Sequence, residues 1–241
     1  MRTEIPNNNV SIDYKNILDN FITSLVNKQK NNLISVYMNG SYARGDATDL
    51  SDLDIFCIFA HLDNNVLNDV GDTTRNTTIL FGKFEINSQC FSLNEIEDPS
   101  FINWREKSVR ILDSVLLYGE DLFGNEVSVD ELESIYKRYL VDVLMSIRHY
   151  ICVDKAKENL TYHKLKTYIL KPLMFPLRME HYLLTGYFPL TIDDLYNACV
   201  DNKRLLIEYF RNQEKLDNDI KTNHKLVLEK MQSLVLSMLN M

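Results

Sequence analysis

The sequence predicts an α+β protein: an N-terminal domain built on a mixed sheet, followed by a C-terminal all-α helical bundle. Short β-like apolar runs recur before about residue 125, and beyond it the apolar residues recur at helical spacing throughout. With 241 residues, 45% of them apolar, the chain is long enough to fill two cores. The change of period therefore places the two domains at residues 1–125 and 126–241.

The first half is predicted to begin with a helix, in which apolar residues recur at helical spacing from Ile17 to Val26. Buried strands are expected at 32–38 and 52–60, on either side of a polar stretch, and the run 78–91 is β-like over most of its length. A helix leading into a short strand is expected within 99–124. The predicted order is helix, strand, loop, strand, strand, helix, strand.

The second half is predicted to be a bundle of about four helices. Ser128 and Glu131 have the spacing of a capping box, and an apolar stripe from Leu132 to Ile151 follows. The helical region near 160–185 contains two prolines, which bend or interrupt it, and ends at Gly186. Two further helices are expected, one starting at the Thr191 and Asp194 pair and one over 223–240.

Charge and composition narrow the class of protein. Residues 1–125 contain 10 Lys and Arg against 18 Asp and Glu, whereas residues 126–241 contain 16 of each. This acidic balance argues against general nucleic-acid binding, which needs a basic surface. No apolar run approaches the about 18 residues of a membrane span, and no secretory signal or C-x-x-C spacing is seen. We therefore expect a cytoplasmic protein with reduced cysteines and no membrane partner.

The stretch GSYARGDATDLSDLDIFC, residues 40–57, holds the candidate chemistry. Asp52 and Asp54 are one residue apart in an expected strand, so both carboxylates lie on the same face. Carboxylates this close repel each other, and a divalent cation with oxygen ligands relieves the repulsion. Magnesium with a nucleoside triphosphate is the usual case. A D-x-D pair alone is also common on solvated strand edges, so the neighbouring residues decide.

The residues just upstream suit phosphate. Gly40 follows the expected strand directly, where a glycine lets the backbone approach a ligand, and Ser41 offers a hydroxyl beside free N–H groups. Arg44 can neutralise a phosphate oxygen with a forked contact. Phosphate donors on one side and metal ligands on the other are what in-line displacement at an α-phosphate needs. The combination therefore predicts a site rather than an acidic turn.

This arrangement resembles the signature of the DNA polymerase β-like nucleotidyltransferase superfamily. The stretch GSYARGDATDLSDLDI is especially similar to minimal nucleotidyltransferases and to aminoglycoside nucleotidyltransferases. The resemblance implies Mg²⁺-dependent transfer of AMP from ATP to a hydroxyl of a small polar acceptor such as an aminoglycoside, and hence a role in antibiotic resistance. The helical half would then bind the acceptor, and the acidic first half would attract a cationic one.

The resemblance leaves a second function open. Minimal nucleotidyltransferases of antitoxin type modify a partner protein, so the acceptor would be a tyrosine of that partner. The helical half of more than 100 residues argues against this alternative. Some relatives also build their cleft from two subunits, so the resemblance allows a homodimer.

The resemblance implies roles for individual residues. Asp52 and Asp54 would hold the metal ions, while Gly40, Ser41 and Arg44 would hold the phosphates.

Two further carboxylates are candidates by the same resemblance. The superfamily adds a third acid on a neighbouring strand, which Glu85 matches as a metal ligand or as the general base. Asp142 is the counterpart of a base that some of these enzymes place on the first helix of the second domain. The alternatives are that Glu85 is a solvated strand residue and that Asp142 lies on a solvated helix flank.

Overall fold

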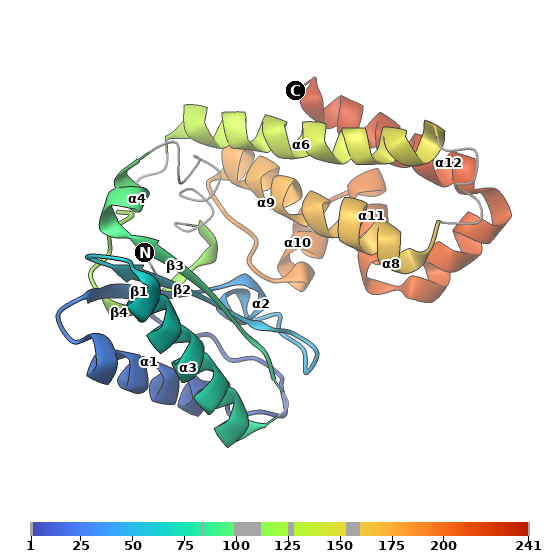
Figure 1. Ribbon diagram of the computed structural model, residues 1–241. Coiled ribbons are helices and arrows are strands. Elements are labelled where there is room, and N and C mark those ends of the chain that lie inside the picture. Colours follow the sequence, from blue (N-terminus) through green and yellow to red (C-terminus); the bar gives the residue numbers. More distant parts are fainter. Residues whose placement is uncertain (1, 83, 99–111, 125–127, 153–159, 241) are drawn as a thin grey trace. The chain divides into compact units, whose positions relative to one another are not determined.

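The structure is a computed structural model that describes residues 2–82, 84–98, 112–124, 128–152 and 160–240 (Figure 1). The chain divides into two compact units, Met1–Val127 and Ser128–Met241. The first unit contains the sheet, and in the described part of the second unit all the secondary-structure elements are helices. The predicted α+β class is therefore confirmed. None of the described helices combines the length and the apolar composition that crossing a bilayer requires.

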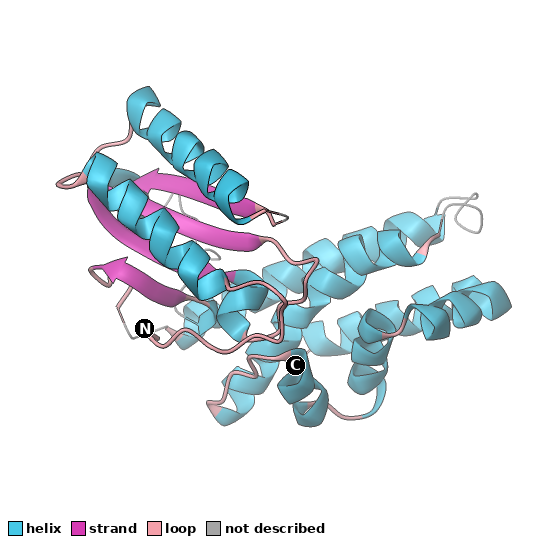
Figure 2. Cartoon of the chain, turned by 90° about the horizontal axis from the view of Figure 1, so that it is seen from below, coloured by secondary structure: helices cyan, strands magenta, loops and turns pink. Residues whose placement is uncertain are grey.

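The sheet of the first unit has four strands in the order β3-β2-β1-β4. Their bounds are β1 Leu33–Asn39, β2 Leu53–Phe59, β3 Ile86–Ser92 and β4 Val115–Gly119. Strand β1 pairs antiparallel with β2 and β4, whereas β2 and β3 are parallel, so the sheet is mixed as the sequence predicts. Helices α1 (Tyr14–Gln29) and α3 (Asn64–Phe81) lie side by side on one face (Figure 2).

The sheet separates two clusters of buried side chains. Toward α1 and α3, the buried residues of β2 are Leu53, Ile55, Cys57 and Phe59. The opposite face carries a smaller aromatic cluster, made of Tyr37, Phe56, Ile58 and Phe123. Because side chains alternate along a strand, Asp54 shares the face of Phe56 and Ile58. Asp54, one of the candidate metal ligands, therefore lies on the face turned away from α1 and α3.

Helix α3 is missing from the sequence prediction, and the β-like interpretation of 78–91 is wrong for residues 78–81, which form the last turn of α3. The buried positions of α3 are Val66, Val70, Thr73 and Thr77. Since half of them are threonines, the helical apolar pattern is weak in the sequence, although the spacing is helical. The helix predicted within 99–111 falls outside the described residues.

Two short helices complete the described part of the first unit. Helix α2 (Gly40–Arg44) follows β1 without a break, and α4 (Leu93–Glu97) follows β3. Helix α2 ends at Gly45, which has a left-handed φ of 87°. A residue without Cβ adopts this conformation at no steric cost. The candidate phosphate residues therefore lie in one tight turn at the end of β1.

The described helices of the second unit are α6 (Val129–Cys152), α8 (Tyr162–Leu165), the π-helical turn η1 (Lys166–Leu170), α9 (Lys171–Thr185), α10 (Ile192–Ala198), α11 (Asp201–Arg211) and α12 (Gln213–Leu239). Helix α6 packs against α9 and α12. The capping box of Thr191 and Asp194 starts α10 as predicted. Helix α11 was not predicted.

Two prolines lie in the helical region 162–185, and the helix geometry changes just before the first of them. Pro172 is the second residue of α9, just after the π-helical turn, and Pro176 lies inside α9. The Lys171 N–H donates to the carbonyl of Lys166, five residues back. Because a proline cannot donate to the carbonyl four residues back, a locally widened turn accommodates the first one. The prolines therefore reshape the helical region without ending it, and Gly186 ends it as predicted.

Candidate active site

Gly40 lies against the carboxylate of Asp54. The antiparallel pairing of β1 and β2 places Asn39 opposite Asp54, and Gly40 follows with φ of 70°. A Cβ built on Gly40 would lie 2.4 Å from Asp54 Oδ2, closer than real Cβ contacts come. The left-handed backbone therefore favours glycine at this position, and any side chain here would displace the Asp54 carboxylate. The candidate phosphate turn and the candidate metal ligand meet at this point.

Asn87 holds the other oxygen of Asp54. The parallel pairing of β2 and β3 places Asn87 opposite Asp54, and its Nδ2 donates to Asp54 Oδ1 at 2.9 Å. On the other side of Asp54 along this row, Ser114 Oγ donates to Asn39 Oδ1 at 2.5 Å. A row of polar side chains thus crosses the end of the sheet. None of the three neighbours of Asp54 in this row is among the predicted site residues, although alternation along the strand puts Asn87 on the same face as Glu85.

Asp52 and Glu85 line one open pocket of about 500 Å³, together with Asp49, Leu50, Ser51 and Phe84. Both carboxylates are exposed, and the Leu53 N–H donates to the Glu85 carbonyl at 2.8 Å, which holds the two segments side by side. Within the described residues, no group of three or more His, Cys, Asp or Glu side chains is arranged to hold a metal ion. The structure therefore brings Asp52 and Glu85 to one pocket without preforming a three-carboxylate site.

Arg44 is engaged by two carboxylates of its own unit. Its Nη1 lies 2.9 Å from Asp113 Oδ2, and its Nε lies 3.3 Å from Asp46 Oδ1. Burial opposes the charge of Arg44, but Asp113 and Asp46 outweigh it, and the pKa of Arg44 lies above its ordinary value. Arg44 therefore ties the turn after β1 to the segment before β4. Its predicted phosphate contact stays a prediction.

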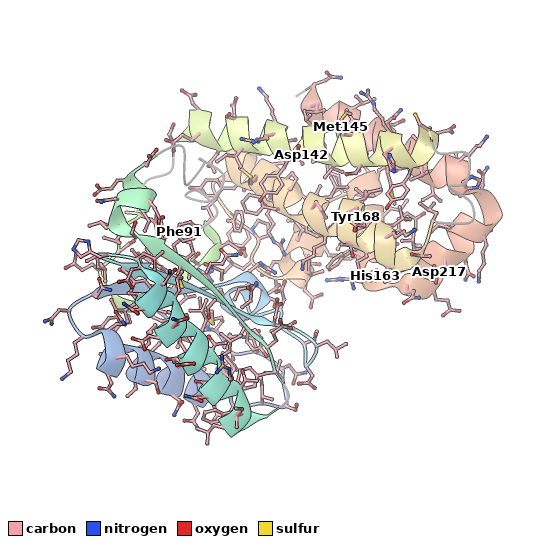
Figure 3. The ribbon with its side chains drawn as sticks, in the orientation of Figure 1. Phe91, Asp142, Met145, His163, Tyr168 and Asp217 are labelled. Atoms are coloured by element: carbon pink, nitrogen blue, oxygen red, sulfur yellow. The ribbon has the colours of Figure 1, made fainter. Side chains whose placement is uncertain are left out.

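Asp142 belongs to the second unit. It lies on α6 (Figure 3) and is exposed, next to the buried stripe of Leu140, Val143 and Leu144. The Ser146 hydroxyl donates to the Asp142 backbone carbonyl at 3.1 Å, an ordinary contact one turn along the helix. The placement is that of a residue on the flank of an amphipathic helix. Its assignment as a general base remains a prediction.

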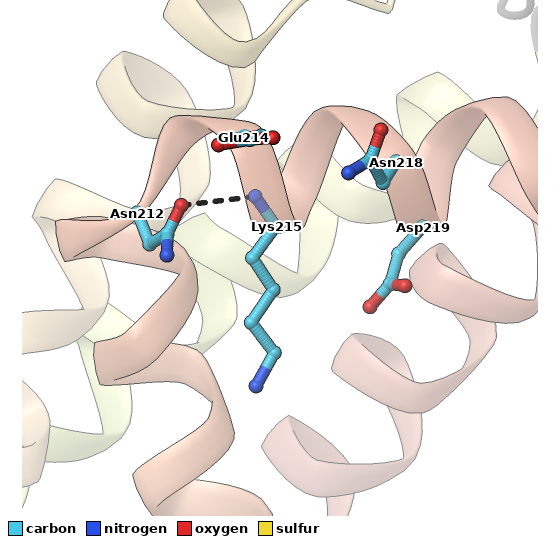
Figure 4. Close-up of a pocket in the computed structure, with 5 residues that line it drawn as sticks. All are labelled: Asn212, Glu214, Lys215, Asn218 and Asp219. Atoms are coloured by element: carbon cyan, nitrogen blue, oxygen red, sulfur yellow. Dashed lines mark hydrogen bonds between the residues drawn. The ribbon is translucent and has the colours of Figure 1, made fainter.

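The second unit has a pocket of its own, of about 340 Å³, lined by Asn212, Glu214, Lys215, Asn218 and Asp219 (Figure 4). Asn212 caps α12 by accepting from the Lys215 N–H at 3.0 Å. Lys215 pairs with Glu208, and Asp219 accepts from the Tyr209 hydroxyl at 2.6 Å. These polar side chains serve to start α12 and to join it to α11, so we assign no ligand to this pocket.

The similarity of this chain to known proteins covers most of the first unit and extends into the second. The family described as nucleotidyltransferase domain matches residues 18–165, more than half of the chain, and this range contains all the predicted site residues. None of the curated proteins compared with the chain matches it. Among solved structures, spectinomycin adenyltransferase AAD(9) from Enterococcus faecialis, solved with ATP and spectinomycin, is similar in fold. It is 13% identical with a TM-score of 0.54, over 92% of this chain and 98% of that one.

The family match and the geometry around Asp54 agree. The matched range carries the glycine turn and the D-x-D strand that the structure brings into contact at Gly40 and Asp54. The solved structure shares the combination of a sheet unit and a helical unit, because the similarity covers nearly all of both chains. This chain therefore belongs to the nucleotidyltransferase domain family of the DNA polymerase β-like superfamily and is a nucleotidyl-transferring enzyme.

Proposed function

We propose that this nucleotidyltransferase moves AMP from ATP to a hydroxyl group of a small polar acceptor such as an aminoglycoside antibiotic. The contact between Gly40 and Asp54 carries the proposal, because it joins a turn suited to phosphate to a carboxylate suited to a metal ion. The similar solved structure contains ATP and spectinomycin, and its resemblance spans both units. The acidic excess of residues 1–125 favours a cationic acceptor. A cytoplasmic location, where ATP is available, is part of the proposal.

Asp52 and Asp54 would hold Mg²⁺. They offer the carboxylate oxygens that this ion prefers, and Asn87 fixes one oxygen of Asp54 while the other faces the Gly40 turn. When bound, the ion would neutralise charge on the triphosphate and on the leaving pyrophosphate. Gly40 and Ser41 would contact the phosphates from the other side. Positioning and charge neutralisation would then supply most of the rate enhancement.

The transfer itself forms a bond between the acceptor oxygen and the α-phosphorus and breaks the bond to pyrophosphate. The acceptor hydroxyl loses its proton to a carboxylate in this step. Glu85, which shares a pocket with Asp52, and Asp142, on the first helix of the second unit, are the two candidates for this base. If Glu85 instead completes the metal site, Asp142 is left as the base.

The test is incubation of the purified protein with each labelled nucleoside triphosphate and Mg²⁺, against aminoglycosides, spectinomycin and lysate proteins. We expect label from ATP on a small molecule, and no label with the double variant Asp52→Asn, Asp54→Asn, whose activity should fall by roughly a thousandfold or more. Labelled protein without labelled small molecule would instead support a protein-modifying, antitoxin-like enzyme. Unchanged transfer by the double variant would overturn the proposed site.

A further inference from the structure

The segment Arg2–Ser11, which precedes α1, lies along the turn and loop that connect β1 to β2. Hydrogen bonds from this segment reach Tyr42, Ala43, Ala47 and Asp49. These residues lie between the candidate phosphate residues Gly40 and Ser41 and the candidate metal ligand Asp52. The contacts therefore span the loop between the candidate phosphate residues and Asp52. This loop sets the distance between them.

Asn8 makes the central contact. Its Nδ2 donates to the Tyr42 carbonyl at 3.0 Å, and its Oδ1 accepts from the Ala47 N–H at 2.9 Å. A primary amide offers a donor and an acceptor from one planar group, so a single side chain bridges the two backbone positions. Tyr42 and Ala47 are both buried, which makes these two bonds costly to leave unmade. Asn8, which lies outside the loop in the sequence, therefore fixes Tyr42 and Ala47 relative to each other.

The ends of the segment are anchored as well. The Arg2 carbonyl accepts from the Leu116 N–H of β4 at 2.8 Å, and Arg2 Nη1 donates to the Ala43 carbonyl at 2.9 Å. Ser11 donates to Asp49 Oδ1 through its N–H at 2.6 Å and through its hydroxyl at 2.9 Å. The segment thus connects the sheet edge, the turn after β1 and the loop before β2.

The loop also has bonds of its own. The Gly45 and Asp46 N–H groups both donate to the Ser41 carbonyl, at 3.0 and 3.1 Å, and the Thr48 N–H donates to Ser51 Oγ at 3.0 Å. These bonds define two local turns, before and after Ala47. Ala47 lies between them: its side chain packs in the core cluster and its N–H donates to Asn8, so this contact helps to fix the relative position of the two turns.

We propose that the segment Arg2–Ser11 is a positioning element of the nucleotide site and that Asn8 is the residue through which it acts on the loop. The proposal rests on the proposed function of that site. The Asn8 bridge fixes where the turn that carries Gly40 and Ser41 lies relative to Asp52, so it sets how well the site accepts the phosphates of ATP. Loss of the bridge should weaken binding of the ground state and of the transition state alike, which raises KM for ATP and leaves kcat nearly unchanged.

The experiment compares Asn8→Ala with Asn7→Ala and Asn9→Ala. Asn7 and Asn9 are exposed neighbours of the same type, and Asn7 contacts the side chain of Lys15 rather than the loop. We expect Asn8→Ala to raise KM for ATP about tenfold, with kcat within about twofold, while the two controls match the unmodified protein. Asn8→Asp keeps the acceptor for the Ala47 N–H and loses the donor to the Tyr42 carbonyl. Its KM for ATP should therefore lie between that of the unmodified protein and that of Asn8→Ala.

Hydrogen exchange of the backbone amides gives a readout that needs no turnover. Asn8→Ala should accelerate exchange at Ala47 about tenfold or more, with exchange in α1 and α3 unchanged, whereas Asn8→Asp should keep Ala47 protected. Unchanged exchange at Ala47, equal effects of all three alanine variants, or faster exchange throughout the first unit would each overturn the proposal. If the unmodified protein transfers no nucleotide, the proposed function fails while the exchange data still decide the role of Asn8.

Discussion

The Cα of Gly40 and the carboxylate of Asp54 are in such close contact that a Cβ at position 40 would come within 2.4 Å of Asp54 Oδ2. The two residues are brought together by the pairing of β1 and β2, fourteen positions apart in the sequence. A carboxylate that meets a backbone without a side chain stays accessible to a cation and a phosphate at once. The central contact of the site can therefore be tested by adding one carbon atom.

Gly40→Ala is expected to lower nucleotidyl transfer by about a hundredfold or more, because the new Cβ displaces the Asp54 carboxylate. It should also cost about 1–2 kcal/mol of stability, because φ of 70° is strained for alanine. Gly186→Ala is the matched control, since Gly186 has φ of 73° and nothing within 4 Å of its Cβ position. Thermal unfolding and turnover should separate the two: equal losses of activity in both variants would contradict the contact.

Asn87 is expected to act through Asp54. Asn87→Ala removes the hydrogen bond to Asp54 Oδ1 and should lower kcat about tenfold, with little change in thermal stability, because Asn87 is exposed. Asn87→Asp places a second carboxylate beside Asp54, and like charge raises the pKa of both groups. On acidification, the Mg²⁺ concentration needed for half-maximal activity should therefore begin to rise at a higher pH than in the unmodified enzyme. A pH dependence of this concentration identical to that of the unmodified enzyme would rule this role out.

Arg44 has two candidate roles that mutation separates. If it only holds the turn, Arg44→Ala removes its ion pairs with Asp46 and Asp113 and should cost about 2–4 kcal/mol of unfolding free energy. Asp113→Asn, which removes one partner only, should then cost less stability while changing KM for ATP by a similar small factor. If Arg44 contacts phosphate, Arg44→Ala should raise KM far more than Asp113→Asn does. Urea unfolding with ATP titration measures both quantities.

The general base can be assigned from two exposed carboxylates. Glu85→Gln and Asp142→Asn should both fold normally, because neither side chain is buried. The variant that lacks the base should lose about a hundredfold or more in kcat and show no acid limb in its pH–rate profile. The other variant should keep the limb. Retention of the limb in both would mean that neither residue accepts the proton.

Cysteine reactivity reports burial independently of the active site. All four cysteines are free, but Cys152 alone is exposed. Burial raises the pKa of Cys90 and of Cys199 to about 11, and raises that of Cys57 as well, so few thiolates form there at pH 8. Iodoacetamide at pH 8 should therefore alkylate Cys152 first, as peptide mass spectrometry can show. Early labelling of Cys57 would contradict the packing of β2.

Much of this protein follows from local sequence patterns. The apolar run 53–60 predicts a buried strand, in which alternation places Asp54 on the face opposite Leu53 and Ile55, and the helical period of Leu132 to Ile147 predicts α6. The G-S turn and the D-x-D spacing are equally local, and they carry the family resemblance. These features depend on residues a few positions apart, so no knowledge of the distant chain is needed.

The tertiary structure alone decided which partners meet. Asn87 and Gly40 reach Asp54 because two strand pairings with independent registers coincide there. Arg44 reaches a partner 69 residues away, and Asn8 reaches Ala47 across 39 residues. Helix α3 is not predicted from the apolar pattern, because threonines occupy half of its buried positions. Periodicity specifies which face a side chain occupies, whereas strand register and the packing of distant segments specify what it touches.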